Sequence, residues 1–369
     1  MTTVFSYHSR TFENTRFEAA VLGIKRYGLD IEKEECERSE DEKLALGFII
    51  RTSALQGDRN HERSMTRDMS AILVSGCPRS GTTWLGKVLS KSPGIRYVHE
   101  PFNVRFPHPS TSFRSRFSFE HLTSDDEERL NQLQKLFKGH GKVWTLDKRG
   151  VKLKELLKWY VTELRTKSSA QTLIKDPIAF LSLEALAERF QPRIVVIGRR
   201  PESIIASHMV RGWDFANLKT YVETMRPLNI WTDQQLDKTL DCEDTPVQRV
   251  AHMWRLLALW QIQLQERHPD WIFVRYEDLA REPEQGFRSL CTRLGLAFNG
   301  PLEAYLASLN KPSQGRYGTQ KVLNVNRSRD QLKDPDKALE PDLDRQVKTI
   351  CRDELGTLYP ETLETLQTL

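Results

Sequence analysis

The sequence predicts an α/β fold, a three-layer sandwich in which helices cover both faces of a central, mostly parallel sheet. Three short, β-branched runs support this prediction, at residues 71–74, 194–197 and 271–274. Continuous apolar runs are typical of strands that are buried on both faces, as parallel strands are. Amphipathic helical patterns lie between the runs, at residues 181–190 and 247–266. Strand and helix patterns that alternate in this way predict a doubly wound sheet.

The same patterns divide the chain of 369 residues into an N-terminal extension and one domain with insertions. We expect one domain over residues 69–369, with a weaker strand run at residues 172–174. Residues 1–68 are charge-dense and do not join the strand and helix pattern, so they are expected to form a helical or partly disordered extension. The stretches near residues 103–170 and 211–246 are predicted to be insertions over the carboxyl edge of the sheet, where α/β proteins bind ligands.

The composition argues against several classes of protein. Five cysteines are scattered along the chain without a CxxC pair, which argues against a zinc ribbon or a disulfide framework. No apolar run approaches the roughly 18 to 20 residues of a membrane span, and the first residues lack the apolar core of a signal peptide. A net charge of +5 is too small to predict nucleic-acid binding. We therefore expect a cytoplasmic protein with no integral membrane segment and no nucleic-acid partner.

The most specific motif is the turn GCPRSGTTW at residues 76–84, between the first apolar run and a helical pattern. Such a turn presents backbone N–H groups and a helix N-terminus to an anion. The spacing of Gly76 and Gly81 is that of a nucleotide P-loop, but Thr82 stands where the P-loop has lysine, and the basic residue is Arg79. A loop without that lysine suits a diphosphate-like group better than a triphosphate with its metal. A turn that binds no ligand is the alternative.

The segment PRSGTTWL at residues 78–85 resembles the 5′-phosphosulfate loop of the sulfotransferase family, which uses 3′-phosphoadenosine 5′-phosphosulfate (PAPS). The resemblance implies a fold like that of the P-loop nucleotide hydrolases, with PAPS as the co-substrate. It implies that Arg79, as in carbohydrate and tyrosine sulfotransferases, contacts the 5′-phosphate and the bridging oxygen. Trp84 matches a position that stacks on adenine in many members, and a core role for its ring is the alternative. The residues implied to cradle the phosphate are Ser80, Gly81, Thr82 and Thr83.

A second anion site is predicted where the next buried strand ends, at Arg199 and Arg200. Two adjacent arginines at such a place indicate an anion or an acidic partner. Ser207 follows Arg199 by eight residues, a spacing that resembles the 3′-phosphate site of the family. Arg200 replaces an Asp or Asn that is common in the family, which leaves open which arginine makes the contact. The alternative is a structural ion pair and a helix serine.

Two later segments give weaker signals. The segment RYEDL at residues 275–279 resembles a family segment whose tyrosine lies near the adenine, so Tyr276 is a candidate cofactor contact. A packing role for this ring is the alternative. The basic loop at residues 311–318 contains Arg316, a candidate for closing the 3′-phosphate pocket, and a solvated surface loop is the alternative.

Sulfuryl transfer needs a base that takes the hydroxyl proton and cations that stabilise the charge on the bridging oxygen. Lys175, at the end of a candidate strand, is the second predicted cation after Arg79. The EP dipeptide at Glu100 is similar to that of carbohydrate sulfotransferases, in which the Glu is the proposed base. We predict Glu100 as the base, with a pKa raised by partial burial. The alternative bases are His99 and Asp176.

The sequence therefore predicts a PAPS-dependent sulfotransferase that acts on a hydroxyl group without a metal. The EP dipeptide favours a carbohydrate acceptor, while lipid, peptide and small-metabolite hydroxyls stay open. Pro177 stands where the phenol and steroid enzymes carry a histidine, which argues against such acceptors. Two other classes stay open, a P-loop kinase or nucleotidase that uses ATP and Mg²⁺ and a non-catalytic nucleotide-binding protein. The predicted catalytic residues are Glu100, Arg79 and Lys175.

Overall fold

The computed structural model describes the part of the chain that carries most of these motifs. The described residues are 71–103, 119–138, 171–209, 211–241, 245–309 and 338–362. All of them belong to one compact unit of the chain. The predicted extension at residues 1–68, most of the insertion at residues 103–170 and the candidate Arg316 lie outside the described residues.

The described residues form a five-stranded, all-parallel sheet in the order β2-β3-β1-β4-β5. The strands are β1 (Ile72–Ser75), β2 (Ile95–His99), β3 (Gln171–Lys175), β4 (Arg193–Gly198) and β5 (Ile272–Arg275). The predicted α/β class is therefore confirmed, and each of the four apolar runs overlaps a strand. Because β1 pairs with both β3 and β4, the carboxyl ends of these three strands meet at one edge.

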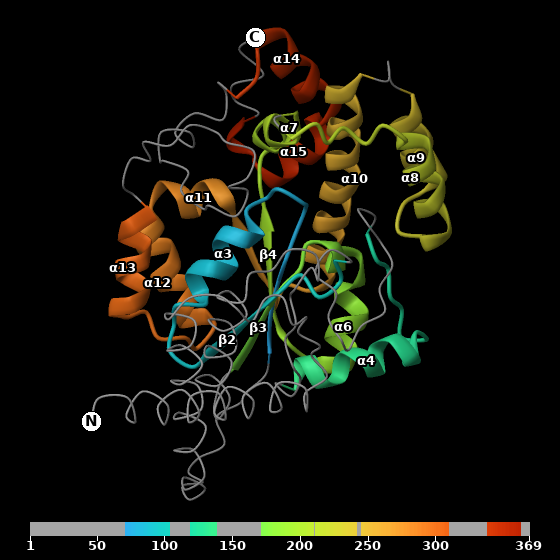
Figure 1. The fold of residues 1–369 in the computed structure, drawn as a ribbon. Coiled ribbons are helices and arrows are strands. Elements are labelled where there is room, and N and C mark those ends of the chain that lie inside the picture. The colour runs from blue at the N-terminus through green and yellow to red at the C-terminus, as the bar shows by residue number, and fades with distance from the viewer. Residues whose placement is uncertain are drawn as a thin grey trace, which may run out of the picture. The chain divides into compact units, whose positions relative to one another are not determined.

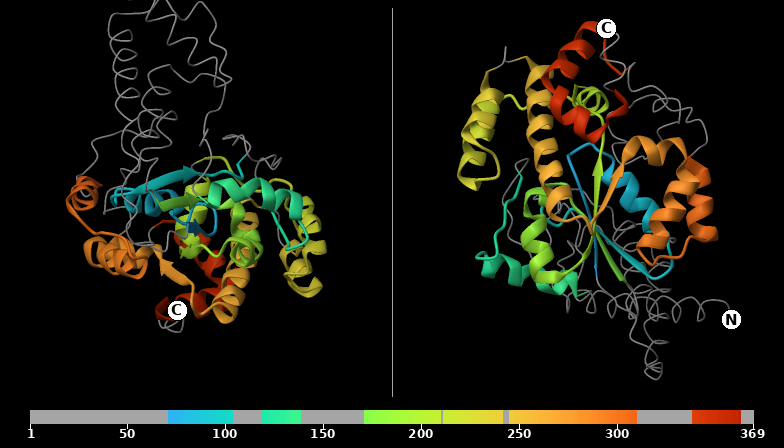
Figure 2. Two further views of the ribbon diagram at one scale, coloured as in Figure 1. Left: turned by 90° about the horizontal axis from the view of Figure 1, so that it is seen from below. Right: turned by 180° about the vertical axis from the view of Figure 1, so that it is seen from behind.

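Helices cover both sides of the sheet, which is seen edge-on in Figure 1. On one side lie α3 (Thr82–Leu89), α11 (Tyr276–Arg281), α12 (Pro283–Arg293) and α13 (Gly300–Leu309). On the other side lie α6 (Leu183–Phe190), which follows the short 3-10 helix η2 (Ile178–Ser182), and α10 (Pro246–Arg267), with α4 (Glu127–Phe137) against α6. The two views of Figure 2 show the same three layers. The predicted sandwich is thus present.

Further helices lie near the carboxyl edge of the sheet or beside α10 (Figure 1). Near this edge lie α7 (Pro201–Met209), α14 (Pro341–Ile350) and α15 (Arg352–Leu358), which pack with α10. The stretch near residues 211–246, which was predicted as an insertion, forms α8 (Leu218–Met225), the 3-10 helix η3 (Arg226–Leu228) and α9 (Asp233–Leu240). A capping box between Thr232 and Gln235 starts α9, so a local signal for this helix was present in the sequence.

Burial on both faces explains why the strand sequences are continuously apolar. Ile72, Leu73 and Val74 of β1 are all fully buried, although successive side chains point to opposite faces. Two tryptophans of α10 anchor that helix to the sheet region, because the Trp254 indole donates to the carbonyl oxygen of Arg199 (3.0 Å) and the Trp260 indole to that of Phe180 (2.9 Å). The backbone at the end of β4 is thereby held in place. Among the described residues, no helix is both long and apolar enough to cross a membrane.

Candidate active site

The turn between β1 and α3 is a tight loop that only glycine can form at two positions. Gly76 has φ 145°, and a Cβ atom there would lie 2.3 Å from the carbonyl oxygen of Ile197. Gly81 has φ 104°, and its Cβ would lie 2.5 Å from the ring of Tyr276. Arg79 itself has a left-handed φ of 73°, a conformation that costs energy for a side chain with a Cβ and is common at functional sites. Packing against β4 and the first residue of α11 therefore fixes the loop conformation.

The loop contains polar groups that lack a protein partner. The hydroxyl group of Ser80 is fully buried and has no hydrogen-bond partner among the described residues. No side chain caps α3, which begins at Thr82, so its first backbone N–H groups are available to a ligand. Cys77 lies buried in the same turn, with its thiol 3.5 Å from the carbonyl oxygen of Pro78. Unpartnered buried donors are rare in proteins, so these groups make the loop a candidate ligand site.

The loop and the second predicted anion site lie in contact. The Arg79 guanidinium donates through Nε to the hydroxyl oxygen of Ser207 at 2.9 Å. Arg199 Nη1 donates to the backbone carbonyl oxygen of Arg79 at 3.3 Å. Residues from β1, β4 and α7 thus converge, as expected for a ligand that spans two neighbouring strand ends.

The two adjacent arginines have different surroundings. Arg200 donates from Nε and Nη2 to the buried carboxylate of Glu202, at 3.3 and 2.8 Å, and its backbone N–H donates to Glu277 at 3.0 Å. Arg199 is 7% exposed, lies over the ring of Tyr276 at 4.1 Å, and its Nε has no hydrogen-bond partner among the described residues. Arg200 therefore forms a structural ion pair, and the geometry favours Arg199 as the arginine that meets an anion.

The predicted base and the second predicted cation form an ion pair where β2 and β3 end. The ammonium group of Lys175, which is fully buried, contacts Oε1 of Glu100. Asn103 donates from Nδ2 to the other carboxylate oxygen at 2.6 Å. The Glu100 backbone has φ 46° and its N–H donates to the Lys175 carbonyl oxygen at 2.7 Å. The pairing of β2 with β3 brings these groups together.

The expectation of a raised pKa for Glu100 is wrong. Burial by itself raises this pKa, but the charge of Lys175, the neighbouring His99 and the hydrogen bonds from Lys175 and Asn103 outweigh it. The pKa of Glu100 therefore lies below the usual range of a glutamate, and the group is a carboxylate at neutral pH. A base with such a low pKa is deprotonated in nearly every protein molecule at neutral pH, but it binds the transferred proton weakly.

The two alternative bases lie in the same cluster. Burial, and then the charge of Lys175, lower the pKa of His99 to about 3, and its Nδ1 contacts the Tyr97 hydroxyl at 3.1 Å. Burial and the Glu100 carboxylate raise the pKa of Asp176 to about 7. Both Asp176 oxygens accept backbone N–H groups, from Phe102 at 2.7 Å and Ile178 at 2.9 Å. Asp176 therefore holds the turns around it, which favours Glu100 as the base.

Aromatic rings flank the loop on two sides. Trp84 packs edge-on against Tyr276 and Phe287, each with ring centroids 5.1 Å apart, so part of its surface belongs to the core. The Arg79 guanidinium lies 5.7 Å from the ring centroid of Trp213. Sequence reasoning had not assigned Trp213 to the site.

Two further contact residues were missed by the sequence reasoning. Asn103 binds Glu100, and its signal was its place three residues after the predicted base. Glu277 binds the Arg200 backbone, and it directly follows Tyr276. For each of these two residues, the only local signal in the sequence was its position close to a predicted site residue.

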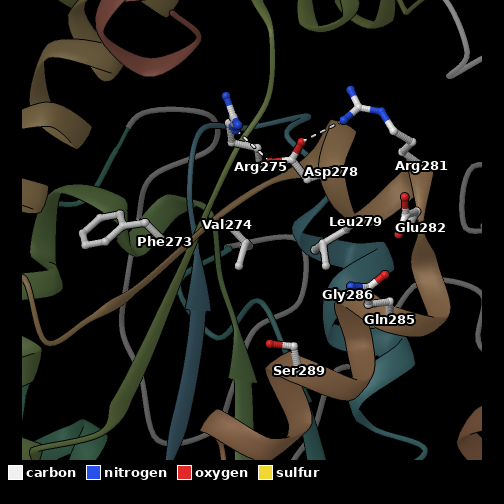
Figure 3. Close-up of a pocket in the computed structure, with 10 residues that line it drawn as sticks. All are labelled: Phe273, Val274, Arg275, Asp278, Leu279, Arg281, Glu282, Gln285, Gly286 and Ser289. Carbon is white, nitrogen blue, oxygen red and sulfur yellow. Dashed lines mark hydrogen bonds and ion pairs between the residues drawn. The ribbon is translucent and has the colours of Figure 1, made fainter. Parts of the chain in front are cut away.

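A separate hollow of about 430 Å³ lies along the edge strand β5 and against α11 and α12 (Figure 3). Its floor contains Val274 and Leu279, and the arginines at its rim are paired, Arg275 with Asp278 at 2.8 Å and Arg281 with Asp278 at 3.5 Å. None of the predicted site residues lines this hollow. It is therefore distinct from the loop and the base cluster.

Comparison with known proteins assigns the family. The model of the sulfotransferase family matches residues 71–300. The chain belongs to this family. The matched range contains the loop, the Arg199 and Ser207 pair and the Glu100 cluster. Cytosolic sulfotransferase 7 of Arabidopsis thaliana is 24% identical over 245 residues, which are 66% of this chain and 62% of that protein. The match thus spans less than two thirds of the length of that curated relative.

Solved structures of sulfotransferases also match this family member. The sulfotransferase domain of the Synechococcus PCC 7002 olefin synthase is 18% identical, with a TM-score of 0.39, over 78% of this chain and 98% of that domain. A mouse sulfotransferase complexed with PAP is 12% identical, with a TM-score of 0.38, over 79% of this chain and 86% of that one. The family assignment rests on the match to residues 71–300.

Proposed function

We propose that this member of the sulfotransferase family transfers the sulfuryl group of PAPS to an acceptor hydroxyl and releases adenosine 3′,5′-bisphosphate. One observation carries the proposal: the glycine loop after β1 and the buried Arg199 after β4 are in contact through Arg79. A nucleotide with phosphates at both ends needs two neighbouring anion sites of this kind. Family membership supports the same conclusion.

The residues present fit the two ends of PAPS. At the loop, the Ser80 hydroxyl has no partner among the described residues and no side chain caps the start of α3, as a phosphate cradle requires. At β4, the unpartnered Nε of Arg199 and the hydroxyl of Ser207 suit the 3′-phosphate. The residues proposed to hold the 5′-phosphate are Arg79, Ser80, Gly81, Thr82 and Thr83, and those proposed to lie near the adenine are Trp84 and Tyr276.

The chain's own residues would then carry out three tasks. When bound, PAPS supplies an activated sulfuryl group on a phosphate oxygen. Arg79 places its positive charge beside that phosphate, where negative charge develops as the group leaves. Glu100, ionised because Lys175 lowers its pKa, accepts the hydrogen bond of the acceptor hydroxyl and takes its proton. Lys175 and Asn103 hold the carboxylate in position.

The acceptor is proposed to be a carbohydrate hydroxyl, which rests on the EP dipeptide at Glu100. The cytoplasm stays the expected compartment. A kinase or nucleotidase is disfavoured, because Thr82 replaces the lysine that would reach the terminal phosphates of ATP and because the chain belongs to the sulfotransferase family. A non-catalytic role is disfavoured by the paired carboxylate and ammonium groups of Glu100 and Lys175 at the sheet edge.

Calorimetry in EDTA tests the cofactor proposal. We expect adenosine 3′,5′-bisphosphate to bind more tightly than ATP, because the loop lacks the P-loop lysine and the second site provides Arg199. Transfer of radiolabelled sulfate from PAPS to a panel of oligosaccharides, lipids and peptides, also in EDTA, then tests turnover and acceptor class. Tighter binding of ATP, or a strict requirement for Mg²⁺ in transfer, would contradict the proposal.

A further inference from the structure

The pairing of β4 with β5 makes Arg199 and Tyr276 neighbours. Gly198, the last residue of β4, lies opposite Arg275, the last residue of β5. The next residue of each strand is Arg199 and Tyr276, and both leave the sheet at the same edge. The guanidinium carbon of Arg199 lies 4.1 Å from the ring centroid of Tyr276. The contact therefore follows from the strand register.

The ring of Tyr276, together with the nearby carboxylate of Glu277, compensates the charge of Arg199. The arginine is 7% exposed and the tyrosine 6%, so water contributes little at either group. The Nε atom of Arg199 has no hydrogen-bond partner among the described residues, and Nη1 makes a long contact of 3.3 Å with the Arg79 carbonyl oxygen. A desolvated guanidinium over an aromatic face is held by the negative potential of that face. The Tyr276 ring thus contributes to the orientation of the Arg199 guanidinium.

Other neighbours of the Tyr276 ring hold the ring itself in place. A Cβ atom on Gly81 would lie 2.5 Å from the ring carbon Cδ2, so the loop backbone lies directly against it. Trp84 packs edge-on at a centroid distance of 5.1 Å. Next to the ring, Glu277 accepts the backbone N–H of Arg200 at 3.0 Å and so fixes the turn that carries Arg199.

We infer that Tyr276 is a positioning residue: its ring face holds Arg199 against the loop, and through Arg199 it sets the preference for a nucleotide with a 3′-phosphate. This inference rests on the proposed function and gives Tyr276, besides its proposed place near the adenine, a second task as a support of the 3′-phosphate site. The task is assigned to the aromatic ring, because the guanidinium of Arg199 lies over the ring face.

The test compares two dissociation constants by calorimetry, for adenosine 3′,5′-bisphosphate and adenosine 5′-phosphate. The dissociation constant for adenosine 5′-phosphate divided by that for adenosine 3′,5′-bisphosphate is the ratio that reports the 3′-phosphate preference. A general loss of stability does not change this ratio. In Tyr276→Leu we expect this ratio to fall about five- to thirty-fold, the range of a buried cation–π contact. In Tyr276→Phe we expect the ratio of the wild type, because the ring face remains. Phe298→Leu, which removes a ring 4.3 Å from the Arg288 guanidinium outside the site, is the matched control and keeps the ratio.

A second variant covers the case in which Tyr276→Leu does not fold. Pentafluorophenylalanine at position 276 keeps the shape of the ring but reverses the potential of its face, so it lowers the ratio while Phe does not. An unchanged ratio in the Leu or pentafluoro variant would overturn the inference, as would a loss in Tyr276→Phe as large as in Tyr276→Leu. If the wild type itself showed no preference for the 3′-phosphorylated nucleotide, the proposed function would fall together with the inference. If that preference is present and the variants keep it, the inference alone fails.

Discussion

The loop region and the base cluster lie at the same edge of the sheet but differ in how their charges are satisfied. Around the loop, the Ser80 hydroxyl and the Arg199 guanidinium keep donors without a partner among the described residues. In the base cluster, Glu100 and Lys175 bind each other, and Asp176 accepts two backbone N–H groups. The first region keeps donors that an anion would satisfy, whereas the charges of the second are paired within the protein. Substitutions in the two regions should therefore change different quantities.

The largest effect is expected from Glu100→Gln. The amide cannot take the hydroxyl proton, so turnover falls about 10²- to 10⁴-fold, while the affinity for adenosine 3′,5′-bisphosphate stays near the wild-type value. Rates of sulfate transfer and calorimetry measure the two quantities separately. Glu184→Gln, which makes the same change in the contact with His268 at 2.7 Å, is the matched control and keeps full turnover.

The same variant leaves Lys175 as an unpaired buried charge, so its free energy of unfolding falls by about 3 to 5 kcal/mol. The double variant Glu100→Gln/Lys175→Met removes both charges and recovers stability but not turnover. Urea unfolding checks this expectation. Wild-type turnover in Glu100→Gln would remove Glu100 as the base.

A smaller effect is expected in the loop region from Arg199→Ala. The affinity for adenosine 3′,5′-bisphosphate falls about 10- to 100-fold relative to that for adenosine 5′-phosphate, the range of a lost charge-assisted hydrogen bond. Arg200→Met is the matched control: it disrupts the pair with Glu202, lowers the melting temperature and keeps the ratio. Equal weakening of both nucleotides in Arg199→Ala would contradict a role at the 3′-phosphate.

The smallest effect is expected on the pH dependence of the free energy of unfolding, through His99 of the base cluster. The folded-state pKa of His99 is about 3, below its ordinary 6.5, so between these values the unfolded chain binds a proton that the folded protein does not. Stability therefore falls as the pH decreases through this window, by about 1 to 2 kcal/mol for this group at pH 5. In His99→Gln the loss between pH 7 and pH 5, measured by urea unfolding, is smaller than in the wild type. An equal loss in both proteins would show that His99 is not the group responsible.

The fold and the phosphate loop could be predicted because their signals are local. The run at residues 71–74 is apolar at every position because both faces of β1 are covered, and the glycines of the loop are required by contacts to Ile197 and Tyr276. The charge state of Glu100 could not be predicted. It depends on Lys175, which lies 75 residues away and is brought close by the pairing of β2 with β3.

The choice between Arg199 and Arg200 was open for a similar reason. Adjacent residues at the end of a strand point in opposite directions, and only the packing of β4 against its neighbours shows which one meets the loop. The helices α8 and α9 were missed although the Thr232 capping box was present, because charged and irregular patterns on both sides concealed their short apolar stripes. The contacts of these site residues with a bound nucleotide stay a prediction, which the experiments above test.

The burial of Cys77 has a consequence for the chemical robustness of the phosphate turn. Thiols react with oxidants and alkylating reagents as thiolates, and burial raises the pKa of this one far above its ordinary value. The sulfur therefore stays protonated while the protein is folded, and iodoacetamide modifies it only at the rate of unfolding. Redox changes in the surrounding medium should therefore leave the turn between β1 and α3 chemically unchanged.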